Sequence, residues 1–190
     1  MYYFCINQFI STMSKRNDFI WEGIKTICWF IFAGLCVQTG SLLFNLIYSL
    51  FRPIATHNLH LGLNLSLLYA QSQTLYIWVM GMVIAISALK AWVFYFVIRL
   101  FGTLRLMKPF TEQVALLISK ISYYAFAVGV VSLLAHEIIQ KLVQKGYDLN
   151  QVERYWSDSN AFLMMSAILF AIALIFKKGI EIQNENDLTV

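Results

Sequence analysis

The side chain best placed to support chemistry or signalling is Lys90, which interrupts the apolar run at 75–101. A lysine at the centre of a membrane-spanning helix costs about 2.5–3.5 kcal/mol on insertion scales. Each Leu, Ile, Phe or Val contributes about 0.3–0.6 kcal/mol of favourable insertion free energy, so the run as a whole still inserts into the membrane. An intramembrane cation is typical of a polar interior, a charged partner or a pathway. The alternative is a lysine without a functional role, whose ammonium donates hydrogen bonds to serine hydroxyls and glutamine amides in a packed bundle.

Two neutral polar residues lie in the same kind of environment. Gln38 lies near the centre of the run at 24–51, and Ser87 falls on the same side of its helix as Lys90. The pattern places no acid at the depth of Lys90, and consecutive spans are usually neighbours. We therefore expect the Gln38 carbonyl to accept a hydrogen bond from the Lys90 ammonium. Lys90, Gln38 and Ser87 form the candidate intramembrane polar site.

Histidines and carboxylates outside the apolar runs could bind a metal or catalyse a reaction. His57 and His60 lie in a segment of alternating character, where a shift of three positions points two side chains to opposite faces. His136 and Glu137 are adjacent, so they splay apart on a helix and form no dyad. The sequence has no Gly-rich phosphate loop, no H-E-x-x-H and no G-x-S-x-G. We predict no enzyme activity, no cofactor and no metal site.

The apolar runs that position these residues are long enough to cross a membrane. A hydrocarbon core of about 30 Å needs about 20 helical residues, and the chain is 59% hydrophobic and only 13% charged over 190 residues. We predict an all-α bundle of four transmembrane helices that forms one domain over 1–190. Residues 1–12 are either a start-site extension or a segment on the membrane surface. The predicted spans are 24–51, 75–101, 118–142 and 160–176.

Residues between the spans predict particular turns. Alternate leucines at 59–67 predict an extended segment with one apolar edge, and Ser66 is expected to cap a short helix after it. Thr111 predicts the N-cap of a helix that leads into the third span, and Gly146 predicts the residue that ends it. Small residues four apart let helix backbones approach closely. Two such pairs are Cys36 with Gly40 and Ala125 with Gly129.

The distribution of Lys and Arg predicts the orientation of the bundle. Nine of these cations lie beside the N-terminus, the 102–120 loop and the C-terminus, whereas four lie on the opposite side. The positive-inside rule therefore places both termini in the cytoplasm. The net charge of +4 comes from these flanks and not from a basic patch, so we expect no direct binding of nucleic acid.

Several stretches resemble a known family. The segments KPFTEQVALLISKI, LKAWVFY, FRPIATHNLHLGLNLSLLY, YWSDSNAF and the terminal KKGIEIQNENDLTV are similar to bacterial membrane proteins grouped as domain of unknown function 2975. The resemblance covers Thr26 to Val190, and its most specific part is the terminal E-N-D-L-T-V after a basic pair. It implies a four-span protein of the bacterial inner membrane, often associated with a small helix-turn-helix DNA-binding regulator. It supplies no catalytic residues.

These observations predict a non-enzymatic regulatory or sensory protein in the lipid bilayer. The loop at 102–120 and the acidic tail are expected to contact a soluble partner, which the resemblance implies is the helix-turn-helix regulator. A second copy of the chain, forming a homodimer, remains open as a partner. The alternative function is a small transporter or channel-like subunit with Lys90 and Gln38 in its polar interior. The candidate contact residues of the tail are Glu185, Asp187, Leu188 and Val190.

Overall fold

The computed structural model is all-helical across the residues that the structure describes, which are 2–52, 56, 57, 59, 62–104 and 110–187. Four segments of it are long and apolar enough to cross a membrane: Trp21–Phe51, Gln73–Thr103, Glu112–Gln144 and Gln151–Glu185. The prediction of an all-α, multi-pass membrane protein with four spans is therefore confirmed. The helices are α1 (Tyr2–Phe51), α2 (Ser66–Gln71), α3 (Gln73–Thr103), α4 (Glu112–Gln144), the 3-10 helix η3 (Asn150–Tyr155) and α5 (Ser159–Asp187).

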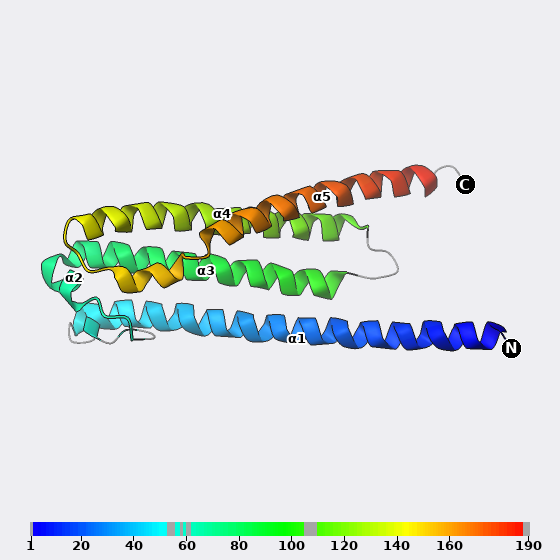
Figure 1. The fold of residues 1–190 in the computed structure, drawn as a ribbon, viewed down its shortest axis with the longest axis horizontal. Helices are drawn as coiled ribbons and strands as arrows, with labels where there is room; N and C mark the ends of the chain where they lie inside the picture. Colours follow the sequence, from blue (N-terminus) through cyan, green and yellow to red (C-terminus); the bar gives the residue numbers. More distant parts are fainter. Residues whose placement is uncertain (1, 53–55, 58, 60–61, 105–109, 188–190) are drawn as a thin grey trace.

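The long helices run side by side and alternate in direction (Figure 1). α3 packs against α1 on one side and α4 on the other, and α4 packs most extensively against α5. α1 begins and α5 ends at the same end of the bundle, which we call the terminal end. The end that carries α2 is called the loop end. Residues from Tyr2 to Thr12 continue α1 as a helix, so the described part of this segment is no separate element.

Helix boundaries follow local chemistry at several predicted points. Thr111 caps α4, because its hydroxyl accepts a hydrogen bond from the Val114 N–H at 3.4 Å. Gly146 follows the C-cap of α4 with φ +92°, a conformation that favours glycine. The cap predicted at Ser66 is wrong. Asn64 supplies the acceptor instead, since its Oδ1 accepts from the Ser66 N–H at 3.1 Å and from the Ser66 hydroxyl at 2.7 Å.

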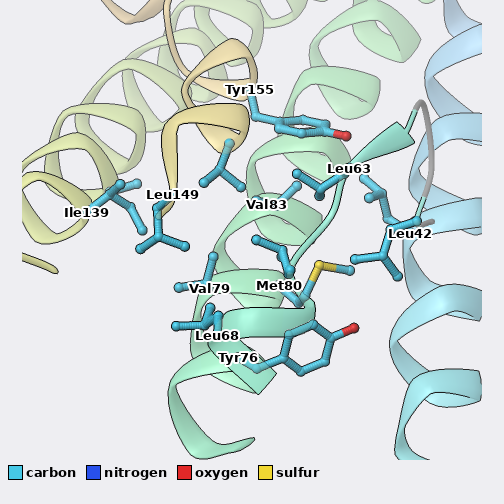
Figure 2. Packing of buried hydrophobic residues seen from close by; sticks show 14 of the residues in the cluster. Leu42, Leu63, Leu68, Tyr76, Val79, Met80, Val83, Ile139, Leu149 and Tyr155 are labelled. Atoms are coloured by element: carbon cyan, nitrogen blue, oxygen red, sulfur yellow. The ribbon is translucent and has the colours of Figure 1, made fainter. Parts of the chain in front are cut away.

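The largest apolar cluster lies in the loop-end half of the bundle (Figure 2). Three of the alternating leucines, Leu59, Leu63 and Leu65, are buried in it, while Gly62 and Asn64 between them are exposed. The predicted apolar edge is therefore confirmed at these positions; His60 and Leu61 lie outside the described residues. At Leu67 the prediction is wrong, because this residue already belongs to the helix α2 and is 65% exposed. Figure 2 shows this segment against α3 together with side chains of the α4–α5 connection. The other members of the apolar cluster that Figure 2 labels include Leu42, Tyr76, Val79, Met80, Val83, Ile139 and Leu149.

The two pairs of small residues behave differently. A Cβ added at Gly129 would lie 2.6 Å from Leu163 Cδ2, and Ala125 is fully buried, so the second pair brings α4 and α5 into close contact. At Gly40 an added Cβ would meet no described atom within 4 Å. Cys36 and Gly40 instead line an apolar groove of about 340 Å³ between α1 and α3. Of the two predicted pairs, only Ala125 and Gly129 therefore lie at a close helix contact.

Candidate functional site

Lys90 forms an ion pair with an acid that comes from the connection between α4 and α5. Its Nζ lies 2.8 Å from Asp158 Oδ1 and 2.9 Å from Asp158 Oδ2, and it also donates to the Tyr155 carbonyl oxygen at 2.9 Å. At 1.5 Å per residue, Lys90 lies about 25 Å from the start of α3 and about 20 Å from its end. The expectation of no acid at this depth, with Gln38 as acceptor, is therefore wrong.

The acid reaches this depth because the connection folds back along the bundle. After Gly146 the chain reverses, and four apolar side chains of the connection are then buried. A 3-10 helix places residues three apart on one face, so Leu149, Val152 and Tyr155 point together toward α3 and α4, with Trp156 beside them. Burying these groups draws η3 alongside α3, as Figure 1 shows. Asp158 follows directly, at the level of Lys90.

A hydrogen bond between the two connections fixes this position further. The Asn64 N–H donates to Gln151 Oε1 at 2.9 Å. Gln151 belongs to η3, whereas Asn64 lies between α1 and α2, so the two loops hold each other over the loop end. Leu63 and Leu65 share the apolar cluster with the buried face of η3. The location of Asp158 is therefore set by packing on several elements.

Asp158 also begins α5. Its carbonyl oxygen accepts from the Phe162 N–H at 3.2 Å, while its carboxylate turns to Lys90. A carboxylate at a helix N-terminus is favoured by the helix dipole. The Lys90 Nζ additionally lies 5.4 Å from the centre of the Phe162 ring. Lys90 thus joins the middle of α3 to the first turn of α5.

A cavity of about 260 Å³ opens beside the ion pair. It brings together the three predicted polar residues Lys90, Gln38 and Ser87, with Gln38 from α1 and the other two from α3. Sequence reasoning missed the remaining polar members, which come from the α4–α5 connection: Arg154, Tyr155 and Asp158. Apolar walls are supplied by Ile31, Leu35, Phe94 and Phe162.

The cavity contains charges of both signs. Among its described lining residues, Lys90 and Arg154 carry positive charge and Asp158 carries negative charge. The Lys90 side chain is 14% exposed and that of Asp158 is 45% exposed, so the carboxylate is the more accessible partner of the pair. The Arg154 Cζ lies 5.3 Å from the centre of the Tyr155 ring. The cavity therefore combines charged and hydrogen-bonding groups with apolar walls.

The polar residues at the loop end form a separate feature. His136 Nε2 lies 3.0 Å from Gln140 Nε2, and both line a cavity of about 180 Å³ with Glu153 and Trp156. Within the described ranges, no three His, Cys, Asp or Glu side chains gather as a metal site requires. This cavity therefore offers hydrogen-bonding groups without a cluster of metal ligands.

Two of the predicted contact residues, Glu185 and Asp187, lie at the terminal end. α5 continues as a helix past Lys177 to Asp187, and Glu185 lies on this extension. Leu188 and Val190 lie outside the described residues. A Cβ added at Gly179 would lie 2.7 Å from Phe110 Cδ1, so the extension rests on the segment before α4. A groove of about 360 Å³ between α4 and this extension is lined by Glu112, Ala115, Leu116, Lys177, Ile180, Glu181 and Asn184.

Fold and site together define an all-α, multi-pass membrane protein with a charged cavity midway along its bundle. No protein-family model, curated protein or solved structure matches the chain. The resemblance to domain of unknown function 2975 therefore stays a prediction from the segments quoted above.

Proposed function

We propose that the protein is a non-enzymatic regulatory or sensory protein of the bacterial inner membrane. The observation that carries this proposal is the Lys90–Asp158 ion pair, which lies beside a cavity and at the first residue before α5. A ligand that alters this pair would act directly on the start of α5. The far end of the same helix carries the acidic tail. One helix therefore connects the proposed ligand site to the proposed partner site.

The packing of α5 supports this connection. Gly129 and Leu163 bring α4 and α5 into close contact, and closely packed helices typically move by small sliding shifts. A ligand can shift such an equilibrium only through different affinities for the two arrangements. A cavity built from α1, α3 and the α4–α5 connection is suited to this, because a movement of α5 changes its shape.

The proposed output is a soluble partner at the terminal end. The resemblance implies a small helix-turn-helix regulator, and the groove beside Glu112 and Glu181 provides a recess next to the tail. Affinity capture from gently solubilised membranes tests this. The full chain should capture the regulator, and deletion of residues 184–190 should reduce capture at equal expression. Unchanged capture would show that the tail is not the contact.

We further propose that both termini lie in the cytoplasm, where the positive-inside rule places them. Their common position at the terminal end and the excess of cations there support this orientation. Reporter fusions after Gly146 should report the outside, and fusions after Lys108 and Val190 should report the cytoplasm. A cytoplasmic signal after Gly146 would contradict the orientation.

A small transporter or channel-like subunit is the second candidate function. The cavity favours it, because Gln38 and Lys90 provide polar groups midway along the bundle. The two functions differ in their requirement for movement of solute. Proteoliposomes that contain the purified chain should show flux dependent on Lys90 if it transports. They should show binding without flux if the chain is a sensor.

A further inference from the structure

We propose that the groove between α1 and α3 binds one anionic phospholipid, with an acyl chain in the groove and the headgroup phosphate at Lys25 and Arg99. The groove has a volume of about 340 Å³. Its walls include Phe32, Cys36 and Leu43 from α1 and Ala88, Trp92 and Tyr95 from α3. This inference goes beyond the proposed function and does not depend on it, because it involves neither the cavity at Lys90 nor a soluble partner.

The groove presents an apolar surface that is open to the surroundings of the bundle. Leu43, Trp92 and Tyr95 are exposed. The Thr39 hydroxyl, which also lines the groove, donates to the Leu35 carbonyl oxygen at 2.8 Å, so its hydrogen bond is made within α1. Both walls belong to segments that can cross a membrane. A hydrocarbon chain fits such a surface, because it needs no hydrogen-bonding partner and gains dispersion contacts.

Lys25 and Arg99 lie on the same helix faces as the groove. Residues seven apart in a helix share one face, so Lys25 lies on the face of α1 that carries Phe32. Arg99 likewise lies on the face of α3 that carries Trp92, and one turn beyond Tyr95. Arg99 is exposed and Lys25 is half-buried. The chain therefore places one cation on each wall of the groove.

Two ring contacts between α1 and α3 place these cations at the same level. The ring centres of Trp21 and Phe101 are 4.9 Å apart, and those of Phe32 and Tyr95 are 6.2 Å apart. α1 and α3 run in opposite directions (Figure 1), and each cation lies between the two contacts along its own helix. Phe32 and Tyr95 line the groove, so both cations lie just beyond its terminal end.

The depth of the two cations suits a phosphate. The spans Trp21–Phe51 and Gln73–Thr103 have 31 residues each, so each is about 46 Å long and extends about 8 Å beyond each side of a 30 Å hydrocarbon core. Lys25 and Arg99 lie four residues, about 6 Å, inside the terminal ends of these spans. Arg99 lies eleven residues, about 17 Å, from Ala88, which is close to half the core thickness. An acyl chain attached to a phosphate at Arg99 would therefore follow the groove to the middle of the membrane.

Charge favours a lipid over a second copy of the chain. The commonest dimers are two-fold symmetric and use the same surface on both copies, so a dimer through this groove would bring Lys25 and Arg99 toward their own counterparts. An anionic phospholipid instead supplies a phosphate, whose oxygens match the paired N–H groups of arginine. In the described part of the chain, neither cation forms an ion pair with an acid.

Quenching of tryptophan fluorescence by brominated lipids tests this proposal with the full chain in vesicles. The probes are phosphatidylglycerol and phosphatidylcholine, each brominated in the middle of its acyl chains and added at the same low mole fraction to phosphatidylcholine at low ionic strength. The difference between the chain and Trp92→Phe isolates the signal of Trp92, and Trp78→Phe isolates that of Trp78, which is exposed nearer the loop end. At Trp92 the anionic lipid should associate at least about fivefold more strongly, because one cation near a phosphate contributes about 1 kcal/mol. Absence of this preference at Trp92, or an equal preference at Trp78, would overturn the proposal.

Substitution of the two cations tests the position of the headgroup. The double variant Lys25→Gln and Arg99→Gln should bring the preference at Trp92 to about one, and each single variant should reduce it. Lys178→Gln is the control, because it removes an exposed cation at the terminal end from α5, whereas the groove lies between α1 and α3. Unchanged quenching of Trp78 verifies that each variant is inserted. A preference that survives in the double variant would refute the headgroup assignment.

Filling the groove tests the position of the acyl chain. An added Cβ at Gly40 or at Gly34 would meet no described atom within 4 Å, so α1 has room for a side chain at both positions. Gly40→Leu extends into the groove and should reduce quenching of Trp92 by both lipids, whereas Gly34→Leu on another face of α1 should not. Equal quenching in the two variants would refute the proposal. So would protection of Trp92 from both lipids in the unsubstituted chain, with normal quenching of Trp78, because a second copy would then cover the groove.

Discussion

Replacing Lys90 by methionine tests the reading of the ion pair most directly. The change keeps the length of the side chain and removes its charge. A lysine that the bundle merely tolerates would cost about 2.5–3.5 kcal/mol of insertion free energy, so its removal would stabilise the protein. The structure predicts the opposite sign. Lys90→Met leaves the Asp158 carboxylate without its cation and the Tyr155 carbonyl without its donor.

The expected change in the free energy of unfolding follows from the solvent exposure of the two charged side chains. Breaking a fully buried pair costs about 3–5 kcal/mol, whereas an exposed pair contributes at most about 1 kcal/mol. Asp158 is 45% exposed, so water can partly solvate it once Lys90 is removed. We expect Lys90→Met to lower the free energy of unfolding by about 2 kcal/mol.

The partner substitution should have the larger effect. Asp158→Asn leaves Lys90, which is only 14% exposed, without a counter-charge, so we expect a loss of about 3 kcal/mol. The double variant should lose less than the two single losses together, with a coupling of at least about 1 kcal/mol.

Reversible unfolding in mixed micelles, followed by circular dichroism, measures all four proteins of this cycle. Lys141→Met is the matched control on an exposed lysine and should stay within about 0.5 kcal/mol of the unsubstituted chain. Stabilisation by Lys90→Met, or a coupling below about 0.5 kcal/mol, would refute the argument.

Three further changes test the packing and the turns by thermal unfolding. Gly129→Ala should destabilise the protein by about 1–3 kcal/mol, because the added Cβ would clash with Leu163. Gly81→Ala is the control and should be neutral or stabilising, because its added Cβ would have no described atom within 4 Å. Equal effects of the two substitutions would contradict the α4–α5 contact. Tyr76→Phe removes the 2.8 Å hydrogen bond to the Ser49 hydroxyl and should cost about 1 kcal/mol; no loss would show that this bond contributes nothing net. Gly146→Ala should cost about 1 kcal/mol because φ is +92°, and stabilisation would contradict the assigned turn.

Local patterns were sufficient to predict most of the fold. The hydrophobic runs determine the spans because length and apolarity alone decide insertion. Thr111 and Gly146 were identified because a cap or a left-handed turn depends on a few neighbouring residues. Ser66 was assigned wrongly because Asn64, only two residues away, could supply the same acceptor.

The ion pair could not be predicted in the same way. Asp158 lies 68 residues from Lys90 in the chain, and only the path of the α4–α5 connection brings them together. That path depends on the burial of apolar residues in the α4–α5 connection, whose overall composition predicts a polar loop. The useful signal was the spacing of Leu149, Val152 and Tyr155, three residues apart, which predicts one buried face. Such a face in a loop indicates that the loop packs into the bundle.

The sequence separation within the ion pair has a consequence for synthesis. At about 5–20 residues per second, a ribosome makes Asp158 about 3–14 s after Lys90, since 68 residues separate them. During that interval α3 has been made with its lysine but without its acid. A nascent or truncated chain that stops before Asp158 therefore presents an unneutralised ammonium within an apolar helix. In the finished chain Asp158 pairs with this ammonium. The unneutralised charge therefore distinguishes unfinished chains from finished ones.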